Sequence, residues 1–437
     1  MRESKIKSWI LIVCMVLLTY PFVEMLTPIE AAGMVNRSNL VTNVEAFTAK
    51  SWFDGSFQES AQNFINDNIG LFPLFINIHN QLEYSLFENI YTGNVVKGKN
   101  NYLFEQGYLD AYAGKDYVGH ERIASTTQQL KSLQDTLQSM GKLLMVCLTA
   151  NKTTYFPEFM PDATRKDSTN LDGYLAQFDA NGINYMNCNP WFLEMKDTLG
   201  YLLFPPYGIH WSHYSTILVA DSIARYMAQK TSWPLADLRI TKKEYSKKTK
   251  YYDNDIAHSM NLFYNLEPDS MLYPEFVWTK PEKPQPKRKL LIVGDSFTWD
   301  IFESSRLGTE CFDEVQFWFY NQTVHTKTNY GASLDPALPM LTRHLNLAEI
   351  LQDYDAFLII CNDPNLANFG WGFMNDALKT LADKDFVPKE RNNDYLADQA
   401  KNKKEWREQL EKLAAQRGIS LDSMIHIYLH DHTFKPE

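Results

Sequence analysis

Cysteine is scarce in this sequence and widely spaced. The 437 residues include five cysteines, with no CxxC pair and no spacing typical of a metal site: Cys14, Cys147, Cys188, Cys311 and Cys361. Cys147 and Cys361 stand in apolar runs typical of strands, which predicts buried free thiols. A disulfide framework and a cysteine-based metal centre are therefore not expected.

Basic residues are outnumbered by acidic ones. The 42 Lys and Arg against 53 Asp and Glu give a formal net charge of -11. Nucleic acid is therefore not an expected partner, because a phosphate backbone calls for a basic face, whereas neutral or sugar-like substrates remain open. The Lys242–Lys250 cluster is compatible with an anionic polymer or a membrane, although a solvated face is the usual explanation for such a cluster.

One long hydrophobic run, Trp9–Leu26, follows the basic residues Arg2, Lys5 and Lys7. Its length of about eighteen residues is near the minimum for a membrane span, and the basic flank is expected to stay in the cytoplasm. We predict that residues 1–30 form a cytoplasmic tail and membrane anchor, and that the rest of the chain faces the periplasm or the cell exterior. A cleaved signal peptide, with a poor cleavage region at 29–33, and a hydrophobic core helix are the alternatives.

The rest of the chain alternates helical and strand-like segments. Residues 39–89 have helical periodicity, and Val95–Phe104 predicts a hairpin. We expect residues 31–115 to pack as an N-terminal segment on a main domain of residues 116–437. This main domain is predicted to be an α/β fold with a mostly parallel sheet covered by helices on both faces. Its predicted helices are 123–140, 171–180, 215–229, 341–351 and 396–417, its predicted strands are 142–148, 183–186, 289–293, 315–320 and 356–361, and 242–289 is an irregular excursion.

The stretch Lys289–Asp300 carries the first candidate for chemistry. Four apolar residues predict a strand buried on both faces, and the Gly294-Asp295-Ser296 that follows predicts a sharp turn into a helix. A hydroxyl at a helix N-terminus lies beside free backbone N–H groups, which suits a nucleophile whose carbonyl target develops negative charge. The alternative is that Asp295 or Ser296 only caps the helix.

The second candidate stretch, Phe204–Ser215, contains His210 on a predicted loop before a helix. Functional loops gather at the carboxyl ends of the strands in open α/β sheets, so His210 can reach a loop that carries Ser296. A lone histidine is otherwise more often a surface residue or a satisfied core residue. The nearby aromatic residues Tyr207, Trp211 and Trp299 are candidates for substrate contact, since aromatic rings stack on sugars.

Together, the His-Trp block and the later Gly-Asp-Ser-Phe block resemble the SGNH-hydrolase-like domains of the alginate O-acetyltransferase type, the AlgJ and AlgX proteins. The N-terminal anchor, the segment 95–104 and the loop 155–161 add to the resemblance. It implies an SGNH-like fold with a circularly permuted motif order relative to ordinary GDSL esterases. It also implies that Ser296 is the nucleophile, His210 the general base and Asn362 an oxyanion donor, although Asn362 fits a simple turn equally well.

The chain departs from this family at one position. The family has an aspartate two residues before the histidine, which orients the imidazole, and here that position is Gly208. A backbone carbonyl or an aspartate from elsewhere would compensate, giving a Ser–His dyad or a rebuilt triad. Without such a replacement the protein would be a weak or inactive relative.

These observations predict an extracytoplasmic O-acyltransferase, an O-acetyltransferase in the leading interpretation, that acts on a cell-surface or exported polysaccharide. The resemblance implies a multi-spanning acyltransferase partner, no cofactor beyond the acyl donor and no metal. A carbohydrate esterase and a non-catalytic polysaccharide-binding subunit are the alternatives, and Gly208 favours the latter. The histidines near the C-terminus, His426, His430 and His432, lack the Cys or Glu that would complete a metal site.

Overall fold

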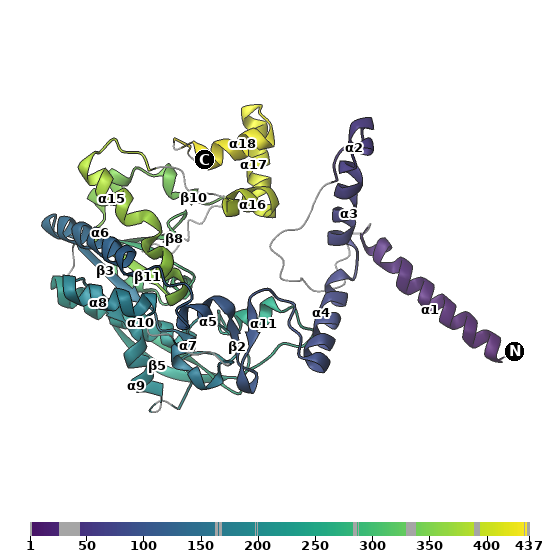
Figure 1. Cartoon of the computed structure of the whole chain (residues 1–437), viewed down its shortest axis with the longest axis horizontal. Coiled ribbons are helices and arrows are strands. Elements are labelled where there is room, and N and C mark those ends of the chain that lie inside the picture. Colours follow the sequence, from purple (N-terminus) through teal and green to yellow (C-terminus); the bar gives the residue numbers. More distant parts are fainter. Residues whose placement is uncertain are drawn as a thin grey trace. The chain divides into compact units, whose positions relative to one another are not determined.

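The computed structural model describes residues 2–25, 44–161, 165, 168–196, 198, 200–282, 286, 288–328, 338–388, 394–431 and 433–434. The chain forms two compact units. The first comprises residues 1–93, 258–265 and 393–425, and the second comprises 94–257, 266–392 and 426–437. Figure 1 labels many of the elements of both units.

The first unit is helical, as the periodicity of its N-terminal part predicts. It contains α1 (Arg2–Met25), α2 (Ala49–Phe53), α3 (Ser56–Asn68), α4 (Phe72–Leu82), the π-helical turn η1 (Glu83–Phe87), α16 (Asp394–Asn402) and α17 (Lys404–Arg417). The predicted helix 396–417 is thus two helices, with a break at Lys403. A further helix, α18 (Leu421–His430), begins at the end of this unit.

Helix α1 exposes nearly all of its apolar side chains. The segment Ile6–Met25 is long and apolar enough to cross a membrane, and 6% of it is buried. A core helix would bury its apolar surface, so that alternative from the sequence does not fit. The possible cleavage region at 29–33 lies outside the described residues.

The second unit is built on a seven-stranded sheet of order β10-β9-β8-β7-β11-β3-β4. The five strands from β8 to β4 are parallel, whereas β9 and β10 are antiparallel at one edge. This confirms the predicted mostly parallel sheet. The strands are β3 (Leu143–Leu148), β4 (Tyr185–Asn187), β7 (Lys289–Gly294), β8 (Glu314–Phe319), β9 (Thr323–Thr328), β10 (Met340–Leu341) and β11 (Ala356–Cys361).

Strands β9 and β10 were not expected from the sequence. The turn from β8 into β9 places Tyr320 and Asn321 in the left-handed region, at φ 50° and 54°. Tyrosine is uncommon there, and the usual Asn-Gly or Asp-Gly signal of a tight hairpin is missing. The sequence therefore contains no clear signal for this hairpin.

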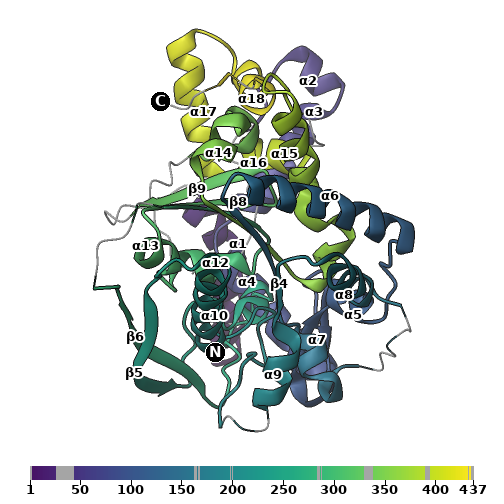
Figure 2. The same ribbon diagram turned by 90° about the vertical axis from the view of Figure 1, so that its left-hand side faces the viewer.

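Helices cover both faces of the sheet, as Figure 2 shows. One face carries α6 (His120–Ser139), α8 (Asn170–Asn181), α14 (Leu347–Asp353) and α15 (Phe373–Ala382), which pack with β3, β7 and β11 into one apolar core. The other face carries α10 (His213–Thr231), α12 (Thr298–Glu303) and α13 (Leu307–Cys311). Every residue of β3 and β11 is buried, which explains their continuous apolar runs. Cys147 and Cys361 are buried free thiols, as predicted.

The remaining elements extend from this sheet. The predicted hairpin is present as β1 (Val95–Lys97) and β2 (Leu103–Glu105), and α5 (Gln106–Tyr112) follows it. The expected irregular excursion overlaps a long antiparallel ribbon of β5 (Asp237–Ser246) and β6 (Met271–Thr279), with α11 (Asp255–Ser259) between the two strands. The second unit also contains two short helices, α7 (Lys152–Tyr155) and α9 (Cys188–Lys196). Its 3-10 segments are η2 (Lys99–Asn101), η3 (Pro157–Phe159), η4 (Thr342–His344) and η5 (Asp363–Gly372).

Candidate active site

Ser296 lies in the turn at the carboxyl end of β7, just before α12 begins at Thr298. The neighbouring Asp295 is buried and holds this turn in place. Its Oδ1 accepts a hydrogen bond from Phe297 N (3.1 Å), and its Oδ2 accepts from the backbone N of Asn362 (2.7 Å). Asp295 therefore ties the serine turn to the end of the neighbouring strand β11.

The structure brings His210 and Ser296 together across 86 residues of sequence. His210 Nε2 lies 2.8 Å from Ser296 Oγ, which is hydrogen-bonding distance. His210 belongs to the loop before α10, whose start is capped by the Ser212 side chain at Ser215 N. The two motifs that the sequence singled out thus meet in one place.

A third side chain, Asp255, completes the arrangement. Its Oδ2 lies 2.6 Å from His210 Nδ1, and its Oδ1 accepts a hydrogen bond from Ile209 N (2.9 Å). Asp255 stands 45 residues after His210, at the start of α11 between the two ribbon strands. Sequence reasoning missed it, because nothing in an irregular Asp- and Asn-containing segment marks one carboxylate as a partner of His210.

Gly208 is compatible with this carboxylate because it has no side chain. A Cβ atom at position 208 would lie 2.8 Å from Asp255 Oδ1 and 2.8 Å from Pro205 Cγ. These distances are too short for a carbon, so a side chain at 208 and the Asp255 carboxylate exclude each other. Of the replacements considered from the sequence, an aspartate from elsewhere is the one found beside His210.

The electrostatics favour a proton on His210. Burial by itself lowers its pKa, but the charge of Asp255 and the hydrogen bond to it outweigh burial, and the pKa of His210 is raised. Burial also raises the pKa of Asp295 to about 6, against the hydrogen bonds that it accepts. Two carboxylates with different surroundings therefore lie near the same imidazole.

Lys152 holds the loop that leads into His210 through hydrogen bonds to the backbone. Its side chain is 0% exposed, and its Nζ donates to three backbone carbonyls, those of Leu103 (2.7 Å), Pro206 (2.8 Å) and Gly208 (2.6 Å). Burial lowers its pKa to about 7, although Asp255 and Glu105 oppose this. The lysine joins strand β2 to the segment that leads into His210.

The predicted oxyanion donor Asn362 lies at the end of β11, with its amide directed to another residue. Its Nδ2 donates to the hydroxyl of buried Tyr108 (2.9 Å). This bond uses one of the two hydrogens on the Asn362 amide nitrogen. Tyr320 lies nearer the serine. Burial raises the pKa of its phenol, and its hydrogen bonds with Asn365 and Ser296 lower it.

The three aromatic candidates differ in exposure. Trp211 is 1% exposed and packs edge-on against Phe297, so its ring belongs to the core beneath the serine and is not open to a ligand. Trp299 is partly buried among rings of β8 and β9, including Phe317 and His325. Tyr207 is partly exposed and directly precedes Gly208.

No group of three or more His, Cys, Asp or Glu side chains among the described residues could hold a metal ion. The rings of His426 and His430 lie 4.4 Å apart on α18. His432 lies outside the described residues.

The serine turn after β7 and the segments that carry His210 and Asp255 lie in a part of the chain that is similar to a known family. Residues 95–300 match the family model of the SGNH hydrolase-like domain of the acetyltransferase AlgX. This match includes Ser296, His210 and Asp255 and confirms, over these residues, the resemblance to the AlgJ and AlgX type.

Similar solved structures are those of Pseudomonas putida AlgJ and Pseudomonas aeruginosa AlgX. The AlgJ O-acetyltransferase domain shares 13% identity at a TM-score of 0.42 over 66% of this chain and 99% of its own. AlgX shares 12% sequence identity at a TM-score of 0.38, and the match covers 65% of this chain and 67% of AlgX. Bacillus cereus PatB1, solved with a sulfonyl adduct, shares 10% sequence identity at a TM-score of 0.39, and the match covers 63% of this chain and 96% of PatB1. No curated protein matches this chain in sequence.

Proposed function

We propose that this protein is an O-acyltransferase that forms an acyl-enzyme on Ser296, with acetyl as the acyl group. The observation that carries the proposal is one continuous chain of contacts, from Ser296 Oγ to His210 Nε2 (2.8 Å) and from His210 Nδ1 to Asp255 Oδ2 (2.6 Å). A nucleophile, a base and a group that orients the base are the parts that covalent acyl transfer needs.

In the first half-reaction, the Ser296 hydroxyl attacks the carbonyl carbon of an acyl ester. His210 Nε2 takes the hydroxyl proton as the new C–O bond forms, and it gives that proton to the leaving alcohol as the ester C–O bond breaks. Asp255 accepts a hydrogen bond from Nδ1–H, which leaves Nε2 free to act as the base.

In the second half-reaction, a sugar hydroxyl attacks the acyl-enzyme. His210 takes the sugar's proton and returns it to Ser296 Oγ as the acyl–serine bond breaks. Negative charge develops on the carbonyl oxygen in both halves. Within the described part of the chain the backbone N–H of Ser296 has no acceptor, so it is a donor for this oxyanion, and Asn362 remains the second candidate.

The proposal places this chemistry outside the cytoplasm, on a cell-surface or exported polysaccharide. It is supported by the apolar segment Ile6–Met25 and by the basic residues that precede it. A multi-spanning membrane acyltransferase would supply the acyl group, and the acyl donor is the only cosubstrate in this scheme. Cross-linking at α1 followed by mass spectrometry would identify such a partner.

Hydrolysis of a chromogenic acetyl ester, with and without oligosaccharides, tests the proposal. We expect turnover by the full chain in detergent, an acetyl adduct on Ser296 by mass spectrometry, and loss of both in Ser296→Ala. His210→Ala should lose turnover by several orders of magnitude. A folded protein that gives neither turnover nor adduct would refute the catalytic function and leave the polysaccharide-binding subunit.

A carbohydrate esterase is the second candidate, and the exposure of the site favours it. The side chains of His210 and Asp255 are 15% and 23% exposed, so solvent reaches the base. Water in place of a sugar hydroxyl would then complete the reaction. Acetylated oligosaccharide among the products decides for the transferase, whereas free acetate alone decides for the esterase.

A further inference from the structure

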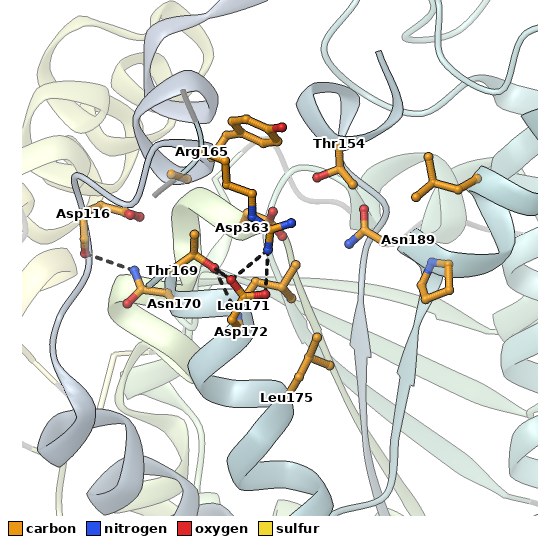
Figure 3. Close-up of a pocket in the computed structure, with 14 residues that line it drawn as sticks. Asp116, Thr154, Arg165, Thr169, Asn170, Leu171, Asp172, Leu175, Asn189 and Asp363 are labelled. Atoms are coloured by element: carbon orange, nitrogen blue, oxygen red, sulfur yellow. Dashed lines mark hydrogen bonds and ion pairs between the residues drawn. The ribbon is translucent and has the colours of Figure 1, made fainter. Parts of the chain in front are cut away.

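A cavity lies at the same edge of the sheet as Ser296. It has a volume of about 280 Å³, near the lower end of ligand pockets, and Figure 3 shows its lining. Its walls come from α5, the start of α8, α9 and the residues that follow β3 and β11. Because β7, β11, β3 and β4 are parallel neighbours, their carboxyl ends meet at this edge.

Two elements connect the cavity to the serine. Asn362, whose backbone N–H binds Asp295, is followed directly by Asp363 in the cavity wall, about 3.8 Å away along the backbone. Helix α5 carries Tyr108, the partner of the Asn362 amide, and one turn later Tyr112 in the wall. A molecule in the cavity therefore lies beside the residues that shape the serine turn.

The charges of the cavity disfavour an anion. Arg165 is paired with Asp172, with Nη2 2.6 Å from Oδ1 and 2.7 Å from Oδ2, which balances those two charges. Two further carboxylates remain, those of Asp116 and Asp363. Both carboxyl oxygens of Asp116 are buried, and burial raises the pKa of Asp116 while the neighbouring Asn170 side chain lowers it. Burial raises the pKa of Asp363, which is 8% exposed, to about 7.

The polar and apolar parts of the lining suit a sugar ring. Carboxylate and amide oxygens accept hydrogen bonds from hydroxyl groups, and Asn170 and Asn189 add amides to the two aspartates. Leu175 and Leu193 supply an apolar wall for the C–H face of a ring. A metal ion fits less well, since no group of three or more potential ligands was found among the described residues.

We propose that this cavity is a binding subsite for one neutral or amino sugar of the acceptor chain, and that it disfavours uronates. The inference rests on the acyltransferase function proposed above, which it deepens by naming the substrate class. The subsite holds the acceptor beside the sugar whose hydroxyl meets the acyl-enzyme.

The test is direct binding, which does not depend on turnover. The full chain carrying Ser296→Ala is titrated by calorimetry in detergent with tetramers of N-acetylglucosamine, glucosamine and mannuronate. We expect the first or second to bind and the third to bind at least about tenfold more weakly. Asp116→Asn and Asp363→Asn should each weaken binding of the preferred tetramer by about tenfold or more, because a buried carboxyl oxygen that accepts from a sugar hydroxyl is replaced by an amide nitrogen.

The matched control is Asp110→Asn, since Asp110 lies on α5, close to Asp116 in the chain, but pairs with Lys115 at 2.7 Å on the surface. It should leave binding unchanged. Tighter binding of mannuronate, no binding by any tetramer, or equal binding by the variants and the control would overturn the subsite. Loss of ester turnover in the unaltered protein would instead count against the acyltransferase, so the two failures are distinguishable.

Discussion

At the residue scale, the two ring nitrogens of His210 have partners from different parts of the chain. Ser296 follows β7, whereas Asp255 comes from the segment between the ribbon strands. The carboxylate keeps the proton on Nδ1, and the serine hydroxyl meets the lone pair of Nε2. The direction of proton transfer thus depends on a residue that no motif marks.

Asp255→Asn should lower kcat by about 10²–10⁴-fold, because the imidazole loses the acceptor that selects its tautomer. The acid limb of kcat/KM should move to lower pH, since Asp255 raises the pKa of His210 and the base form is the active one. Ester hydrolysis followed over pH measures both effects. Asp269→Asn, an exposed residue of the same excursion, is the control and should match the unaltered protein.

Gly208→Asp should inactivate the enzyme, because its Cβ would lie 2.8 Å from Asp255 Oδ1. The double variant Gly208→Asp with Asp255→Ala removes the contact with Asp255 Oδ1, leaves the close approach to Pro205 Cγ, and moves the carboxylate to the family's position. We expect it to be more active than Asp255→Ala alone. A double variant no better than that single one would show that position 208 cannot orient His210 in this loop.

Lys152→Met should destabilise the protein by about 2–5 kcal/mol, because the buried carbonyls of Leu103 and Gly208 lose the Lys152 donor, while Pro206 O keeps only Leu103 N. Chemical denaturation measures the free energy of unfolding. Lys131→Met, which removes an exposed pair with Asp135, is the control and should cost no more than about 0.5 kcal/mol. Equal effects of the two changes would contradict the support that Lys152 gives to the histidine loop.

At the scale of elements, the buried histidine His213 joins α10 to α12. His213 Nδ1 lies 3.1 Å from Asp300 Oδ2, and its ring stacks on Tyr251 at 3.8 Å. This pair fixes the helix that follows the serine turn. His210 and His213 are near neighbours in sequence, yet only His210 contacts Ser296.

His213→Asn should therefore cost stability, on the order of 3 kcal/mol, because buried Asp300 loses His213 and keeps the Ser304 hydroxyl as a donor. Turnover per folded molecule should stay within about threefold of the unaltered protein, whereas His210→Asn should lose it by orders of magnitude. Thermal unfolding and ester hydrolysis on the same samples separate the two effects. A large loss of turnover in folded His213→Asn would assign it a part in the chemistry.

At the scale of the whole molecule, the residues of the candidate site all belong to the second unit, whereas α1 belongs to the first. The exposed segment Ile6–Met25 is long and apolar enough to cross a membrane. Removal of residues 2–25 should move the protein from the membrane pellet to the soluble fraction after ultracentrifugation. Ester turnover should be retained, and a protein that still sediments with membranes would show a second contact.

The sequence by itself determined the parallel core of the sheet and two of the three residues in the chain of contacts, Ser296 and His210. Continuous apolar runs predicted the buried strands β3, β7 and β11, because strands covered on both faces leave no room for polar residues. Short-range signals such as Gly-Asp-Ser and the His-Trp block marked Ser296 and His210. Such signals are local because each residue lies in a turn or loop whose backbone conformation depends on neighbouring residues. The resemblance to AlgJ and AlgX rests on the same local signals.

Only the tertiary structure decided the partner of His210, the burial of Trp211 and the edge strands β9 and β10. Asp255 reaches the imidazole because the ribbon folds back over 45 residues, and Gly208 leaves the space that its carboxylate fills. These outcomes depend on contacts between distant segments, where one aspartate looks like any other in the sequence. A side chain's role there is set by what packs beside it.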